Sequence, residues 1–216
     1  MTILITGANR GIGQALAALY RNAGETVIGT HRAPDTEHMR ALEVTDPASH
    51  KALAARLADT PIDLLVCNAG VNLDQGQALE DGYPAQMWDT CFAANVTGVF
   101  LTIQSLLPNL RQSKAPKIAI IGSQLGSQTI ASGGGYIYCA SKAAVLNLGR
   151  NLAVDLAPEG MAVGVYHPGW VRTDMGGDHA DISMQESAEG LAARFATLSP
   201  ETTGCFETWD GRAHAY

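Results

Sequence analysis

The chain has 216 residues and a net charge of −7, and 46% of its residues are hydrophobic while 16% are charged. This composition is typical of a single globular domain with a sizeable core and excludes an intrinsically disordered chain. The acidic balance, the lack of a basic run and the lack of an uninterrupted apolar run of ~20 residues argue against a nucleic-acid partner and against a membrane span.

Short apolar segments alternate with helical patterns along the whole sequence. We expect strands at 2–6, 26–30, 41–44, 63–68, 117–123, 161–167 and 205–209. We expect helices at 12–24, 47–58, 84–111, 135–157 and 185–198. Apolar strands that lack a polar alternate and are separated by helices indicate a parallel sheet covered on both faces. The prediction is an α/β fold, with one domain over residues 1–216 built on a Rossmann-like doubly wound sheet of about seven strands in the order 3-2-1-4-5-6-7.

The first expected strand leads into TGANRGIGQ, a glycine-rich turn that precedes a helix. Glycines let the backbone approach a pyrophosphate, which the exposed N–H groups of a helix start can bind. Ordinary turns are also glycine-rich, and the spacing G-x-x-x-G-x-G differs from the common G-x-G-x-x-G. The position between a strand and a helix nevertheless favours a phosphate loop made of Gly7, Arg10, Gly11, Ile12 and Gly13.

The second expected strand ends in Thr30-His31-Arg32, without the acidic residue that usually binds the ribose hydroxyl of NAD. Arg32, together with Arg10 from the phosphate loop, can pair with a 2′-phosphate. The alternative is that both arginines are solvated loop residues. Because the two loops converge in this fold, we expect NADPH or NADP as the cofactor, with His31 and Arg32 near the 2′-phosphate, rather than NADH.

Residues 136–142 read YIYCASK, which contains two tyrosines and one lysine. Tyr138 and Lys142 are four residues apart and share a helix face, whereas Tyr136 has Ala140 at this offset. Such a pair is common on helix surfaces. In an enclosed site, however, the ammonium favours the phenolate and lowers a tyrosine pKa from its usual value of about 10.

Six motifs together resemble the short-chain dehydrogenase/reductase family over essentially the whole chain. In chain order they are TGANRGIG (6–13), CNAG (67–70), Asn95 in NVTG, Ser123 in IIGS, YCASK (138–142) and HPGWVRTDM (167–175). Their order, on the expected strand ends and helices, makes a chance match a poor explanation.

The resemblance implies catalytic roles for four residues. Tyr138 would be the general acid and base that protonates a carbonyl oxygen, and Lys142 would lower its pKa and hold the nicotinamide ribose. Ser123 would hydrogen-bond the substrate oxygen, and Asn95 would help to hold a water chain that leads to Lys142. Ser127 lies close by in the sequence, but Ser123 directly follows a strand, where this fold places its site.

The same resemblance implies further contacts with the cofactor. The residues expected around the adenosine are Val44, Asn68, Ala69 and Gly70, and those expected at the nicotinamide carboxamide are Pro168, Val171 and Thr173. Glu43 precedes Val44 at a position where the family more often has Asp. The Pro-Gly pair at 168–169 also fits an ordinary turn after a strand.

The expected function is an NADPH-preferring oxidoreductase that interconverts a small carbonyl compound and an alcohol, with Tyr138 as the catalyst and Tyr136 as a pocket or packing residue. The ending GCFETWDGRAHAY and the glycines at 133–135 resemble a short branch with C-factor-like proteins and small carbonyl reductases. This branch leaves open a cofactor-binding signalling or regulatory protein with little turnover. A sugar-nucleotide epimerase or dehydratase is disfavoured, because residues 175–216 leave room for only a short substrate region.

The two longest expected helices carry more apolar residues than one sheet-facing stripe requires. These residues are Met87, Phe92, Val96 and Phe100 in the first helix, and Val145, Leu148 and Leu152 in the second. The family resemblance implies a homodimer through these helices. The polar tail Asp210-Gly211-Arg212 should discourage pairing at the last strand, so a dimer is expected rather than a tetramer.

The four cysteines, Cys67, Cys91, Cys139 and Cys205, are scattered and form neither a disulfide framework nor a metal-binding spacing. No signal-peptide pattern is visible in the opening MTILITG. We therefore expect free thiols, no metal site and a cytoplasmic location.

Overall fold

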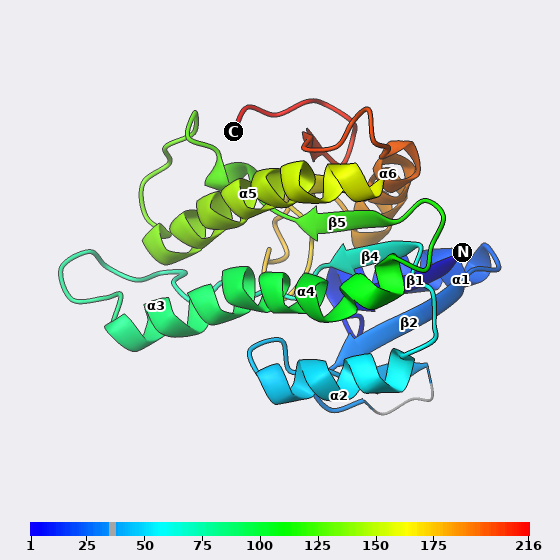
Figure 1. Cartoon of the computed structure of the whole chain (residues 1–216). Helices are drawn as coiled ribbons and strands as arrows, with labels where there is room; N and C mark the ends of the chain where they lie inside the picture. Colours follow the sequence, from blue (N-terminus) through cyan, green and yellow to red (C-terminus); the bar gives the residue numbers. More distant parts are fainter. Residues whose placement is uncertain (35–37) are drawn as a thin grey trace.

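The computed structural model describes residues 1–34 and 38–216, and its centre is one parallel sheet in the order β3-β2-β1-β4-β5-β6-β7. All neighbouring strands pair in parallel. The strands are β1 (Thr2–Thr6), β2 (Thr26–His31), β3 (Met39–Ala41), β4 (Leu64–Cys67), β5 (Lys117–Ile121), β6 (Ala162–His167) and β7 (Phe206–Thr208). The predicted fold class and strand order are confirmed (Figure 1).

The helices follow the predicted ranges closely. They are α1 (Gly11–Asn22), α2 (Pro47–Leu57), α3 (Ala85–Phe92), α4 (Gly98–Leu110), α5 (Tyr136–Leu156) and α6 (Met184–Thr197). Short 3₁₀ turns lie at Gln124–Gly126 and Ala157–Glu159, and a π-helical segment at Ala93–Thr97 joins α3 to α4. This π-helical segment interrupts the single helix expected at 84–111.

The third strand is displaced from its predicted range of 41–44. Only Met39–Ala41 pair with β2, and the chain then turns, with the Asp46 backbone N–H donating to the Glu43 carbonyl at 3.0 Å. The Asp46 side chain next accepts a hydrogen bond from Ala48 and caps α2. Turn and cap chemistry therefore ends the strand early, although Leu42 is buried as its apolar character predicts.

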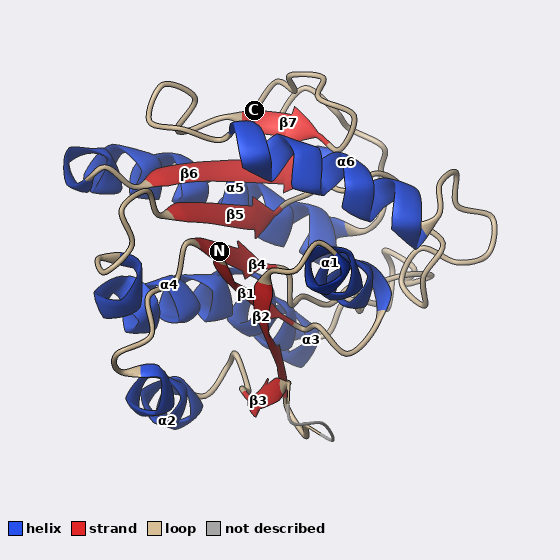
Figure 2. Ribbon diagram, turned by 90° about the vertical axis from the view of Figure 1, so that its right-hand side faces the viewer, coloured by secondary structure: helices blue, strands red, loops and turns tan. Residues whose placement is uncertain are grey.

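Helices cover both faces of the sheet. Figure 2 shows α1 and α6 on one face and α2, α4 and α5 on the other. Side chains alternate between the two faces along each strand: Leu4 packs in the core with α2, α4 and α5, whereas Ile3 and Ile5 pack with α1 and α6. This burial on both faces explains why the strands are apolar throughout.

The helical stretch Ala85–Leu110 has 26 residues and a mean hydropathy of 1.4, which meets the length and composition of a membrane-crossing helix. This stretch is not an uninterrupted apolar run, because polar residues such as Asn95 lie within it. Within the fold, 44% of its most apolar part is buried, and Ile103, Leu106 and Leu110 belong to the core beside the sheet. Core helices meet the same criterion.

The outer edge of β7 is paired by the chain that follows it. Residues 210–212 make a turn in which the Thr208 backbone N–H donates to the Arg212 carbonyl at 2.9 Å, and Glu207 and Ala213 form an antiparallel bridge. The backbone N–H of His214 also donates to the Phe206 carbonyl at 2.8 Å. The polar tail thus covers this edge by pairing with it. Its charges were expected to discourage pairing with another chain, and this pairing adds a second obstacle.

The outward faces of the two long helices differ in part from the prediction. Val145 is 1% exposed and belongs to the core, so it cannot contribute to an outer surface. Phe100 in α4 is 39% exposed, as expected for an outward apolar residue. Val154 in α5 is 74% exposed and was absent from the expected set.

Candidate functional site

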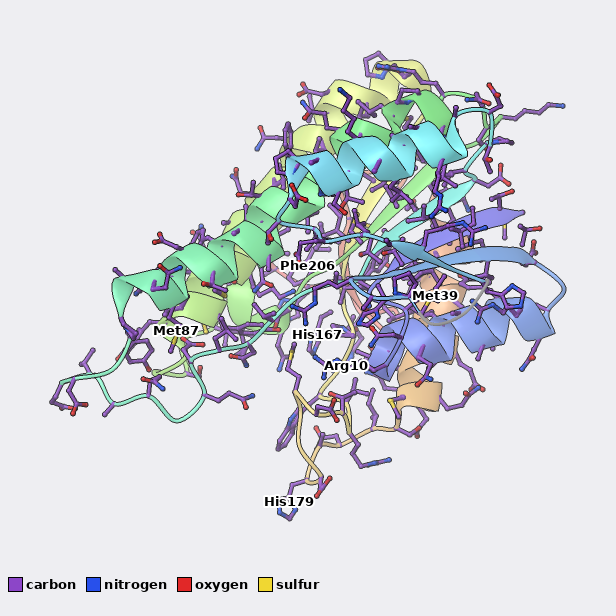
Figure 3. All side chains as sticks on the ribbon, turned by 90° about the horizontal axis from the view of Figure 1, so that it is seen from below. Arg10, Met39, Met87, His167, His179 and Phe206 are labelled. Atoms are coloured by element: carbon purple, nitrogen blue, oxygen red, sulfur yellow. The ribbon has the colours of Figure 1, made fainter. Side chains whose placement is uncertain are left out.

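The predicted site residues gather where β1, β4, β5 and β6 end. In a doubly wound sheet, ligands bind at this carboxyl edge. Figure 3, in which the molecule is seen from below, labels Arg10, which directly precedes α1, His167, the last residue of β6, and His179, which lies at the tip of a loop. Four segments that are far apart in the sequence therefore supply one site.

The phosphate loop is held by close backbone packing. Gly7 has a φ of +65°, which favours glycine, and a Cβ at Gly13 would lie 2.4 Å from the Gly7 carbonyl oxygen and 2.5 Å from Asn68 Nδ2. The first turn of α1 has no side-chain cap and no acidic residue. An uncapped helix start behind a tight glycine turn suits a pyrophosphate, so the residues present fit a dinucleotide cofactor.

The CNAG segment after β4 is bonded directly to the phosphate loop. Asn68 Nδ2 donates to the carbonyl oxygens of Thr6 at 2.9 Å and Gly7 at 3.2 Å. The hydroxyl of Thr6 accepts the backbone N–H groups of Asn68 and Ala69, each at 3.0 Å. These bonds join the ends of β1 and β4 and fix the shape of the loop.

The residues expected near the 2′-phosphate lie at the end of β2, where His31 is the last residue and Arg32 follows, and in the phosphate loop, where Arg10 precedes α1. Arg32 is well exposed, and its Nε lies 3.9 Å from an Oε2 of Glu43. Arg10 Nη1 donates to Asp174 Oδ2 at 2.5 Å, which links the phosphate loop to the segment after β6. Both arginines carry carboxylate partners, with which a bound phosphate would compete.

Asn95 occupies the π-helical segment and is 2% exposed. Its Oδ1 accepts the Val71 backbone N–H at 2.8 Å, and its Nδ2 donates to the Val71 carbonyl at 2.9 Å. Nδ2 also donates to Ser141 Oγ at 3.0 Å and to Cys91 Sγ at 3.3 Å. The Asn95 side chain therefore ties the α3–α4 junction to the loop after β4 and to α5.

The same region brings Asn95 and Lys142 close together around Gly70. A Cβ at Gly70 would lie 3.1 Å from Asn95 Oδ1 and 3.9 Å from Lys142 Nζ. Lys142 is buried on α5, its Nζ donates to the Ile121 carbonyl at 2.8 Å, and it lies 5.6 Å from the centre of the Tyr138 ring. The predicted Tyr–Lys neighbours do meet in space.

Tyr138 and Ser123 form the polar pair expected of a proton donor and its partner. Tyr138 borders a cavity but is otherwise densely surrounded by protein atoms, and this burial raises its pKa to about 12. A hydrogen bond between the side chains of Tyr138 and Ser123 lowers the pKa, but by less than burial raises it. Ser123 is 4% exposed, and its Oγ accepts the Leu125 backbone N–H at 3.2 Å. At neutral pH the phenol is protonated and can donate.

Burial has the largest effect on the pKa of both residues: it raises the pKa of Tyr138 and lowers the pKa of Lys142 to about 8. An enclosed site disfavours each charged form. The expected lowering of the Tyr138 pKa by Lys142 stays a prediction.

The neighbouring serine, Ser127, bonds to the end of the chain, and the segment after β6 bonds to α6 and within itself. Ser127 Oγ donates to the Ala215 carbonyl at 2.6 Å, so it anchors the tail, whereas Ser123 lies at Tyr138. Pro168 accepts from Ser187 Oγ at 2.7 Å. Val171 is buried, and the Thr173 hydroxyl accepts the Gly176 backbone N–H at 3.1 Å.

Asp74 is a site residue that the sequence analysis missed. The N-cap of α5 is Gly135, which has no side chain, and Asp74 Oδ2 takes over by accepting the backbone N–H groups of Ile137 at 2.8 Å and Tyr138 at 3.3 Å. Asp74 lies 63 residues before Ile137, so no local sequence signal could have found it.

A cavity of about 280 Å³ opens beside Tyr138. Its lining comes from Asn72, 74–77, Tyr83, Leu125, 132–135, Tyr138 and Cys139. Tyr136 packs edge-on against Tyr83, with ring centres 5.1 Å apart, which agrees with its expected packing role. The expected substrate region at 175–216 does not line this cavity and stays a prediction for the remaining surface.

Among residues 1–34 and 38–216, no group of three or more His, Cys, Asp or Glu side chains is arranged to hold a metal ion. Within the same ranges, all four cysteines are free thiols.

Comparison with known proteins agrees with this geometry. A family model described as short chain dehydrogenase matches residues 1–182. The chain is 37% identical to C-signal of Myxococcus xanthus over 162 residues, which are 74% of this chain and 96% of that protein. It is 32% identical to 1-hydroxy-2-glutathionyl-2-methyl-3-butene dehydrogenase of Rhodococcus sp. (strain AD45), covering 97% of both chains. The structure of an NADPH-bound carbonyl reductase from chicken fatty liver superposes with a TM-score of 0.91 at 29% identity, covering 100% of this chain and 98% of that one.

Proposed function

The chain belongs to the short-chain dehydrogenase/reductase family, and we propose that it reduces a carbonyl compound with NADPH in preference to NADH, using Tyr138 as the proton donor. As a member of this family it is an NAD(P)H-dependent oxidoreductase for carbonyl and alcohol groups. The observation that carries the proposal is the protonated Tyr138 phenol, paired with Ser123 and bordering a cavity.

The proposed chemistry uses the chain's own residues to handle the proton. A bound NADPH supplies the hydride. Reduction of a carbonyl group places negative charge on its oxygen, and Tyr138 and Ser123 lie together where donors for that oxygen are needed. Lys142, with a pKa near 8, can return a proton toward the phenol, and Asn95 fixes the helix junction behind it. A role of Asn95 in holding a water chain belongs to this proposal.

Cofactor binding is assigned to the residues at the carboxyl edge. The phosphate loop, Gly7 to Gly13, would hold the pyrophosphate at the start of α1, and Asn68 to Gly70 with Val44 would border the adenosine. His31, Arg32 and Arg10 would surround a 2′-phosphate, which supports the preference for NADPH. Pro168, Val171 and Thr173 would border the nicotinamide.

The direct test follows NADPH consumption with a panel of aldehydes and ketones, beside a fluorescence titration of cofactor binding. We expect turnover with at least one carbonyl class and tighter binding of NADPH than of NADH. Cofactor binding without turnover on any member of a broad panel would contradict the catalytic proposal.

A second candidate is a cofactor-binding signalling protein, favoured by the 37% identity to a protein named C-signal. The paired Tyr138, Ser123 and Lys142 geometry favours the enzyme, because a protein that only binds the cofactor does not need a proton donor at a cavity. The same experiment separates the two, since the signalling protein would bind NADPH without oxidising it.

We also propose a homodimer through α4 and α5 in the cytoplasm. Exposed Phe100 and Val154 on these helices support an apolar contact, and the paired edge of β7 disfavours a second interface there. Free thiols suit a reducing compartment. Light scattering at micromolar concentration should give twice the chain mass of 22.7 kDa. A single-chain mass would contradict the dimer, and a mass of four chains would contradict the role given to the β7 edge.

A further inference from the structure

We propose that the cavity beside Tyr138 takes a small hydroxy ketone or hydroxy aldehyde, and that Asp74 and Asn72 accept the hydrogen bond of the substrate hydroxyl. This inference rests on the proposed carbonyl reduction and names its substrate class.

The first observation is an unused oxygen on a buried carboxyl group. Asp74 is 1% exposed, and its Oδ2 holds the start of α5 through Ile137 and Tyr138. Its Oδ1 is buried and has no hydrogen-bond partner. A buried acceptor without a donor destabilises the fold, so such an atom in a site wall marks a place for a ligand donor.

The second observation is a matching acceptor two residues earlier. Asn72 Oδ1 is also buried without a hydrogen-bond partner. Both residues line the cavity that Tyr138 lines, and that cavity has about 280 Å³ of space. Because Asp74 also bonds the Tyr138 backbone, the unused acceptors and the proton donor belong to one rigid unit.

The rest of the lining favours the same class of substrate. Gln75, Gln77 and Ser132 add polar groups, while Tyr83 and Leu125 supply the apolar part. An alkyl ketone in this cavity would leave both unused oxygens without a donor. A site with buried acceptors discriminates strongly against an analogue that lacks the donor.

The test compares two pairs of ketones in which a methyl group replaces the hydroxyl. The pairs are hydroxyacetone with 2-butanone and 4-hydroxy-2-butanone with 2-pentanone, so two positions of the hydroxyl are sampled. We expect kcat/KM with NADPH to favour the hydroxy member of at least one pair by about tenfold or more.

Variants then assign the preference to the two residues. Asp74→Asn can still accept from α5 but presents an amide donor on its other side, so the preference should fall toward equality. Asn72→Leu removes the second acceptor without touching the bonds between Asp74 and α5, and it should also lower the preference. Asp81→Asn, which changes an exposed acid in the same connecting segment, should retain it. Thermal unfolding and NADPH titration of each variant separate these effects from misfolding.

The outcomes distinguish this inference from the proposed function. Equal rates within both pairs, or faster alkyl ketones, overturn the substrate class and leave carbonyl reduction standing. A preference that survives in both Asp74→Asn and Asn72→Leu overturns the assignment to these residues, as would be the case if ordered water alone satisfied them. No reduction of any of the four ketones, when another carbonyl compound of the panel is reduced, overturns the substrate class alone. No turnover with any member of the whole panel overturns the proposed function and this inference with it.

Discussion

The phosphate loop and the start of α5 are both held by the segment that follows β4, but through different kinds of contact. Asn68 fits against the glycine turn, where Gly13 leaves no space for a side chain and Gly7 has a φ of +65° that favours glycine. Six residues further on, Asp74 reaches the backbone of Ile137 and Tyr138 with a single carboxylate oxygen. One region is fixed mainly by close packing and the other by buried hydrogen bonds.

The two regions should therefore respond differently to amino-acid substitutions. In the phosphate loop, an added methyl group must displace backbone atoms, so small substitutions should destabilise the fold and the cofactor site together. At the start of α5, substitutions of equal size can remove one proton donor or one charge and leave the packing intact. Catalysis, binding and stability should therefore separate at α5 and not at the phosphate loop.

The largest expected effect is at the catalytic helix. Tyr138→Phe removes a hydroxyl and little else, so turnover should fall by about 10²–10⁴-fold, the range typical of proton donation. NADPH affinity and thermal stability should remain close to those of the unchanged protein. Steady-state kinetics beside a cofactor titration measures both properties.

Tyr136→Phe is the matched control, because Tyr136 packs on Tyr83 and, two residues before Tyr138, lies on another face of α5 than the Tyr138–Lys142 pair. It should keep most of the activity. A Tyr138→Phe protein that retained wild-type turnover would remove Tyr138 from the mechanism, and equal losses in both variants would indicate damage to the helix start.

The next effect tests the phosphate loop. Gly13→Ala places a Cβ 2.4 Å from the Gly7 carbonyl oxygen, and the unfolding free energy should fall by about 2–3 kcal/mol together with loss of NADPH binding. Urea unfolding and cofactor titration are the measurements. Gln14→Ala, on the exposed side of the same helix, should leave both almost unchanged, and an equally stable Gly13→Ala protein would show that the loop can relax.

These two regions also show what sequence reasoning could reach. The strand and helix ranges, the glycine loop and the Tyr138–Lys142 pair were predictable because each depends on periodicity or on residues a few positions apart. The strand order followed from the alternation of strands and helices, which is typical of a doubly wound sheet. The hydrogen bond from the Tyr138 backbone to Asp74 could not be predicted, and neither could the hydrogen bonds of Asn95 with Val71 and Ser141. These bonds join residues that only the finished fold brings together. The effect of burial on the pKa values of Tyr138 and Lys142 was out of reach for the same reason, since burial is a property of the whole site.

Cofactor choice should respond more weakly, because the arginines are exposed. Arg32→Ala should reduce the preference for NADPH over NADH by about tenfold, through loss of a charge-assisted hydrogen bond to the 2′-phosphate. Titration with both cofactors measures the ratio, and NADH affinity serves as the internal control. An unchanged ratio would shift the assignment to Arg10, whose guanidinium must leave Asp174 to bind a phosphate.

The smallest effect concerns the buried lysine and its pH dependence. Burial lowers the pKa of Lys142 from 10.5 to about 8, so between these values the unfolded chain binds more protons than the folded one. The contribution of Lys142 to the free energy of unfolding therefore rises with pH in this window and is constant below it.

Lys142→Met has no titrating group at this position, so its unfolding free energy does not gain this contribution. From pH 7 to pH 9 the unchanged protein should become more stable relative to Lys142→Met by about 1 kcal/mol. Urea unfolding at both pH values provides the comparison, with Lys51→Met as an exposed lysine control that should show no such trend. If the unfolding free energies of Lys142→Met and of the unchanged protein changed with pH in the same way, Lys142 would be solvated. The burial of the site around Tyr138 would then be contradicted.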